Sequence, residues 1–134
     1  MKLHKTFSSD RQSIRFVEPM LLQIREKANF DDAKFYNIVV AVTEAVNNAI
    51  HHGNSCDPDV HVDLDIELTD KYLTVSVKDR GDGFDHNAVA DPRNKENLLK
   101  ERGRGVFLIK ELADEVHYSV SDEGTFVQMI FAVE

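Results

Sequence analysis

The sequence has few of the features that mark secreted or membrane-bound proteins. Its single cysteine, Cys56, has no second cysteine to pair with, which indicates a reducing compartment and excludes a disulfide-stapled scaffold. No stretch approaches the roughly 20 consecutive apolar residues that a membrane-spanning helix needs. The first ten residues, MKLHKTFSSD, lack the apolar segment of a signal peptide. We therefore expect a cytoplasmic protein with no membrane partner.

Positive charge is also scarce. The 134 residues include 16 Lys and Arg against 24 Asp and Glu, which gives a net charge of −8. Nucleic acids would repel such a chain unless it carried a strong basic patch, so we expect no direct nucleic-acid partner. The composition, 42% hydrophobic and 30% charged, is typical of a compact soluble protein. At this length we expect one domain over residues 1–134.

One long amphipathic helix is predicted in the first half of the chain. It follows Asp31 and Asp32, which are good N-cap residues, and its apolar side chains recur at helical spacing. We expect it to end near His52, with Gly53 and Asn54 forming a left-handed C-terminal cap. An earlier helical pattern over 11–27 is interrupted by a proline and either kinks or begins late.

The rest of the chain mostly has the alternation of strands. Strands are expected at 3–7, 60–68, 73–77, 116–120 and 126–133, with a further helix from 106. These elements predict an α/β (α+β) two-layer sandwich, with helices on one face of a mixed, largely antiparallel sheet. The polar segment between 79 and 104 is long for a loop in a small domain, which is typical of a functional segment.

Three motifs contain residues that could bind a ligand or take part in catalysis, and the first lies on the long helix. Glu44, Asn48 and His52 are four residues apart and therefore form one polar row. An Asn48 oxygen can bind Mg²⁺, and Glu44 can activate a hydroxyl or water beside it. The alternative is a row that merely faces solvent. His51, His52 and Cys56 supply only three ligands in one loop, so we do not expect zinc, and Cys56 is interpreted as a loop thiol.

The second motif, Asp79-Arg80-Gly81-Asp82-Gly83, follows a predicted strand. Gly81 and Gly83 let the backbone approach a flat ligand, and the Asp79 carboxylate can accept a hydrogen bond from an exocyclic amine. An ordinary turn is the alternative. The third motif, Gly103-Arg104-Gly105, opens a helix whose free amides favour a phosphate. It lies in a basic island of four residues: Lys95, Lys100, Arg102 and Arg104.

Together the order and spacing of the motifs resemble those of the GHKL ATPases, which have the Bergerat ATP-binding fold, and within them the anti-sigma factor serine/threonine-protein kinases. Glu44 and Asn48 match the N box, Asp79, Gly81 and Gly83 the first glycine box, and Gly103 and Gly105 the second. The string TEAVNNAIHHG is similar to that of the anti-sigma kinases. The resemblance covers nearly the whole chain. Walker-type and dinucleotide-binding glycine motifs are absent.

The resemblance implies a role for each matched residue. Asn48 would bind the Mg²⁺ that bridges the ATP phosphates, and Glu44 would be the catalytic base toward a partner's serine hydroxyl. Asp79 would hold the adenine amino group, with a hydrogen bond from Thr125 nearby. Residues between the two glycine boxes would form an ATP lid, assisted by Arg102 or Arg104.

The resemblance also implies partners. These are a sigma factor, an anti-sigma antagonist of the STAS-like type, and a second copy in a homodimer, with the residues through Lys27 as a partner surface. The alternative function is an ATP-binding regulatory module of the same fold that binds a partner without kinase activity.

Overall fold

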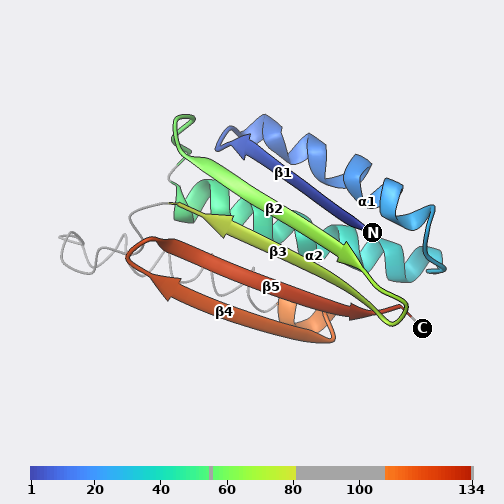
Figure 1. Ribbon diagram of the computed structural model, residues 1–134. Helices are drawn as coiled ribbons and strands as arrows, with labels where there is room; N and C mark the ends of the chain where they lie inside the picture. The colour runs from blue at the N-terminus through green and yellow to red at the C-terminus, as the bar shows by residue number, and fades with distance from the viewer. Residues whose placement is uncertain (55, 81–107, 134) are drawn as a thin grey trace.

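The computed structural model describes residues 1–54, 56–80 and 108–133. Within this part of the chain, the strands form one five-stranded sheet in the order β1-β2-β3-β5-β4 (Figure 1). The strands are β1 (Lys2–Ser8), β2 (His61–Leu68), β3 (Tyr72–Asp79), β4 (Glu115–Ser121) and β5 (Gly124–Ala132). The expected strands are therefore all present.

Every pairing between neighbouring strands is antiparallel. On β2 the apolar residues Val62, Leu64 and Ile66 are buried, and the residues between them face outward. This period of two is what a sheet with one covered face requires. Helices cover that one face (Figure 1), so the prediction of a two-layer α+β fold is confirmed.

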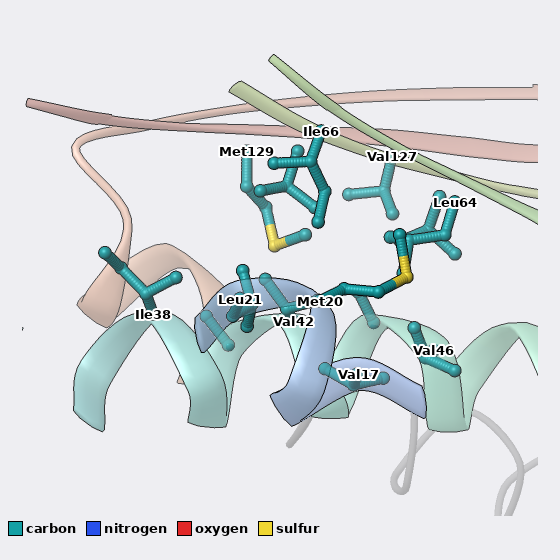
Figure 2. Close-up of a cluster of buried hydrophobic side chains, with 14 of the residues drawn as sticks. Val17, Met20, Leu21, Ile38, Val42, Val46, Leu64, Ile66, Val127 and Met129 are labelled. Atoms are coloured by element: carbon teal, nitrogen blue, oxygen red, sulfur yellow. The ribbon is translucent and has the colours of Figure 1, made fainter. Parts of the chain in front are cut away.

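The core lies between the sheet and two helices, α1 (Val17–Arg25) and α2 (Asp32–Asn48). In Figure 2 side chains from both helices point toward those of the sheet, with Met20 and Val46 beneath Leu64 and Val127. Residues 108–112 are also helical, and their Ile109 is fully buried. No helix in the described ranges is long and apolar enough to cross a membrane.

The first α-helix begins later than the helical spacing of apolar residues over 11–27 would suggest. Residues Arg11–Phe16 form a short 3-10 helix, η1, and the α-helix begins only at Val17. Pro19 consequently lies in the first turn of α1, where its missing N–H costs no intrahelical hydrogen bond. The prediction of a late start is therefore confirmed.

The long helix α2 begins as predicted but ends differently. Its N-cap is Asp31, whose Oδ1 accepts the Lys34 N–H at 2.7 Å. The α-helix stops at Asn48 and continues as a π-helical turn, η2 (Ala49–Gly53). The expected left-handed cap at Gly53 and Asn54 is wrong, because the left-handed residue is Cys56, with φ of 57°. The site described below gives another reason for a glycine at position 53.

Candidate functional site

The candidate site is organised around Asp79, the last residue of β3. Asp79 pairs with Val62 of β2 and is only 3% exposed, although an aspartate is rarely buried. Its Oδ1 accepts the backbone N–H of Thr125 on β5 at 3.0 Å. A buried carboxylate held in place by a neighbouring strand can accept a hydrogen bond from a ligand with little rearrangement.

Two glycines approach Asp79 too closely for any side chain. A Cβ built on Gly53 would lie 2.1 Å from Asp79 Oδ2, and one built on Gly124 would lie 2.2 Å from the Asp79 carbonyl oxygen. Gly124 also has a φ of 129°, which L-residues rarely adopt. The end of η2 and the start of β5 therefore enclose Asp79 from two directions.

A pocket of about 240 Å³ lies beside Asp79. Its lining among the described residues comes from α2 with η2, from β3, and from β4 with β5, and consists of Ala45, Asn48, Ala49, Val77, Asp79, Tyr118, Val120, Thr125 and Val127. The walls are therefore mainly apolar, with a few polar groups. This is the composition expected of a site for a flat, mostly apolar ring with a polar edge.

The N-box residues lie on α2 next to this pocket. Asn48, the last residue of α2, is half-buried and lines the pocket. Glu44 lies one helical turn earlier, is also half-buried, and is outside the lining. His52 lies in the π turn, so the α-helical spacing that placed it in line with Glu44 and Asn48 does not apply.

The structure therefore brings together Asn48, Asp79 and Thr125, with Glu44 one turn from Asn48. The remaining predicted site residues lie outside the described residues, and they are Gly81, Gly83, Arg102, Gly103, Arg104 and Gly105. The sequence patterns did not predict that β4 supplies apolar walls of the pocket, or that Gly53 lies against Asp79. The alternation of Tyr118 and Val120 was visible, but the sequence does not show that β4 pairs with β5 beside the pocket.

An ion pair lies near the site, on the face of the sheet opposite the helices. The Arg80 guanidinium contacts Asp63 Oδ2 at 2.7 Å, and the Thr6 hydroxyl donates to Asp63 Oδ1 at 2.6 Å. Burial alone would raise the pKa of Asp63, but these hydrogen bonds and the positive charge of Arg80 outweigh it and lower the pKa. Asp63 therefore stays ionised and fixes the side chain of the residue that comes directly after Asp79.

One close pair of potential ligands joins η2 to the loop that follows it. Cys56 Sγ lies 3.1 Å from His51 Nδ1. Within the described ranges, no group of three or more His, Cys, Asp or Glu residues could hold a metal ion.

Comparison with known proteins places this architecture in a class. The family model of the histidine kinase-like ATPase domain matches residues 7–131. The chain therefore belongs to the histidine kinase-like ATPase family, the GHKL class that its motifs resemble. Within that family it is similar to proteins named serine-protein kinase RsbW.

The sequence relatives are bacterial. The chain is 34% identical to RsbW of Staphylococcus epidermidis over 113 residues, which cover 79% of this chain and 69% of the relative. It is 32% identical to RsbW of Staphylococcus aureus over 99 residues, which cover 69% of this chain and 61% of the relative. The recognition of the anti-sigma kinase family is thereby confirmed at the level of the family.

Solved structures support the fold. One contains the RsbU and RsbW domains of a Mycobacterium tuberculosis protein, with a TM-score of 0.69, 22% identity, and coverage of 98% of this chain and 32% of that chain. Another is the blue-light activated histidine kinase EL346 of Erythrobacter litoralis, with a TM-score of 0.55, 24% identity, and coverage of 79% of this chain and 33% of that chain. This chain thus spans about a third of each.

Proposed function

We propose that the protein is an anti-sigma factor and an ATP-dependent protein serine kinase, which binds a sigma factor and phosphorylates a serine of an antagonist protein. The observation that supports ATP binding most directly is the buried Asp79 carboxylate in a mainly apolar pocket. An adenine ring combines an apolar face with an exocyclic amino group that donates hydrogen bonds. Such a ring matches both properties of the pocket.

The size of the pocket favours the base over the whole nucleotide. Its volume of about 240 Å³ is below the roughly 300–1,000 Å³ of sites that enclose a complete drug-sized ligand. We infer that adenine occupies the pocket and that the phosphates extend past Asn48. Gly81, Gly83, Gly103 and Gly105 with Arg102 and Arg104 are proposed to contact the nucleotide there.

Asn48 suits a role at the phosphates. It lines the pocket at the end of α2, and its amide oxygen is a neutral ligand of the kind Mg²⁺ accepts. Bound Mg²⁺ would neutralise phosphate charge, and it ordinarily takes few protein ligands together with phosphate oxygens and water.

Glu44 is proposed as the catalytic base. It would take the proton of a serine hydroxyl on the antagonist while the serine oxygen bonds to the γ-phosphorus and the bond from that phosphorus to ADP breaks. Its place one turn before Asn48 sets the base beside the proposed phosphate position rather than in the adenine pocket. Phosphoryl transfer depends chiefly on such positioning and on charge neutralisation.

The proposed partners are a sigma factor, a STAS-like antagonist and a second copy of the chain in a homodimer, all in the cytoplasm, with residues 1–134 acting as one domain. The net charge of −8 supports a basic surface on the sigma factor as the contact. Binding that weakens with added salt is expected, and a salt-insensitive complex would argue against this contact.

The test is phosphate transfer from Mg-ATP to a candidate antagonist. Glu44→Ala should lose transfer and keep ATP binding, whereas Glu67→Ala, on the exposed face of β2, should keep both. Asn48→Ala should weaken Mg-ATP binding, and Asp79→Ala should lose adenine selection, as measured by calorimetry. ATP binding without transfer to any antagonist would favour the regulatory module, and unchanged affinity in both variants would refute the site.

A further inference from the structure

Asn54 connects several elements at the end of the sheet where Asp79 lies. Its side chain is 3% exposed, and its Nδ2 donates to Ser9 Oγ at 2.8 Å and to the His61 carbonyl at 3.1 Å. Its Oδ1 accepts the backbone N–H of Arg80 at 3.0 Å. Both amide hydrogens and the carbonyl oxygen therefore have protein partners, as a buried amide requires.

The partners of Asn54 are themselves fixed. Ser9 is fully buried, and its Oγ donates to the Val60 carbonyl at 2.6 Å. The backbone N–H of Asn54 donates to the Ala49 carbonyl at 2.9 Å, the hydrogen bond of the π turn. Asn54 is therefore anchored by its backbone to the π turn that follows the N-box helix, and by its side chain to β2 and to Ser9, the residue directly after β1.

The hydrogen bond to Arg80 acts on the backbone of Asp79. The Arg80 N–H and the Asp79 carbonyl belong to one planar peptide unit. Asn54 holds the N–H side of this unit, and Gly124 lies against the carbonyl side, where a Cβ would be 2.2 Å from the oxygen. The orientation of the peptide between Asp79 and Arg80 is thus restrained from both sides.

We propose that Asn54 is a positioning residue that sets the Asp79 carboxylate for adenine recognition. The inference rests on the proposed function, in which Asp79 accepts the adenine amino group. Binding constellations of this kind must be held within about 0.5 Å of the productive geometry, and they rely on surrounding hydrogen bonds to do so. Asn54 supplies that support by joining the N-box helix to the strand that carries Asp79.

Asn54→Ala tests the proposal, with Ser13→Ala as the matched control. Ser13 is also buried, and its Oγ donates to the Ser8 carbonyl at 2.8 Å, so the control loses a buried hydrogen bond that does not involve Arg80. The measurement is the ratio of the ATP and GTP dissociation constants. Guanine carries a carbonyl oxygen where adenine carries its amino group, so this ratio depends on the Asp79 carboxylate.

We expect Asn54→Ala to lower the preference for ATP about fivefold, the size of one lost hydrogen bond, and Ser13→Ala to leave it unchanged. Amide hydrogen exchange without nucleotide should show faster exchange at Arg80 in Asn54→Ala only. If Asn54→Ala does not fold, Ser9→Ala removes one anchor of the same side chain and should produce both effects at a smaller size.

The outcomes separate the two proposals. An unchanged ATP preference in folded Asn54→Ala would overturn the positioning role, and so would an equal change in the Ser13→Ala control. In either case, ATP binding by the wild-type protein would still support the proposed nucleotide site. A wild-type protein that binds no ATP would overturn the proposed function. Even then, slow hydrogen exchange of the Arg80 amide in the wild-type protein and faster exchange in Asn54→Ala would establish that Asn54 restrains the peptide between Asp79 and Arg80.

Discussion

Substituting Gly53 by alanine should separate nucleotide binding from stability. The new Cβ would lie 2.1 Å from Asp79 Oδ2 and 2.2 Å from its Cγ, so one of the two residues must move. Asp79 is constrained by the Thr125 N–H at 3.0 Å on its other oxygen. Gly53 is the last residue of the π turn, which is held by hydrogen bonds from the Asn54 and Cys56 N–H groups to the Ala49 and Ile50 carbonyls. The strain therefore falls on the carboxylate proposed to hold adenine.

The two expected effects differ in size. Overpacking destabilises a fold by about 1–3 kcal/mol, whereas replacing a glycine in helical backbone by alanine stabilises it by about 0.5–1 kcal/mol. The free energy of unfolding should therefore fall only modestly. A hydrogen bond to a charged group contributes about 1.5–3 kcal/mol, so displacing the carboxylate should weaken ATP binding about ten- to a hundredfold.

Calorimetric titration with ATP and urea unfolding measure these effects on the same samples. Asn47→Ala is the control, because Asn47 lies on α2 outside the pocket lining, and it should bind ATP like the wild-type protein. Gly124→Ala should lose more stability, because its φ of 129° disfavours any side chain, and it should also weaken ATP binding, because its Cβ would lie 2.2 Å from the Asp79 carbonyl oxygen. A folded Gly53→Ala protein with wild-type ATP affinity would refute the role assigned to the contact.

Three further predictions concern stability. The lowered pKa of Asp63 means that its ionised form stabilises the fold above the unfolded value near 3.8 and that this stabilisation is lost as the pH falls through the folded pKa. Below about pH 4, wild-type urea midpoints should therefore fall more steeply than those of Asp63→Asn, and parallel curves would contradict this. Leu64→Ala removes a fully buried side chain and should cost about 2–5 kcal/mol by urea unfolding, with ATP affinity unchanged well below the melting temperature. Asp31→Ala removes the N-cap of α2 and should cost about 1 kcal/mol in the same assay, and a neutral result would mean that water replaces the cap.

The sequence was sufficient for the sheet and for the start of α2, because both depend on local patterns. Alternating apolar residues identified β2 and β3, and an aspartate before a helical period identified the cap at Asp31. The end of α2 was mispredicted because a glycine near a helix end usually serves as a left-handed cap. Gly53 instead allows the backbone to lie against Asp79, because it has no side chain. Asp79 is 26 residues away, so no local sequence pattern indicates this contact.

The residues of the candidate site could be identified from the sequence only where they belong to spaced motifs. Asn48 and Asp79 stood out because each belongs to a motif, and the structure places both at one pocket. The pairing of β3 with β5 brings Thr125 to Asp79, and this pairing crosses some 46 residues of sequence. Asn54 could not be recognised as a connector, since its partners Ser9, His61 and Arg80 come from separate strand ends.

The π turn holds one residue more than an α-helical turn. In η2 the Asn54 N–H reaches back five residues to Ala49, whereas an α-helix would reach back four. Deleting one residue between Ala49 and Gly53 would let the same N–H bond to the same carbonyl in an ordinary α-helical turn, with Gly53 and Asn54 still beside Asp79 and Arg80. Relatives that share this site can therefore have a segment one residue shorter here.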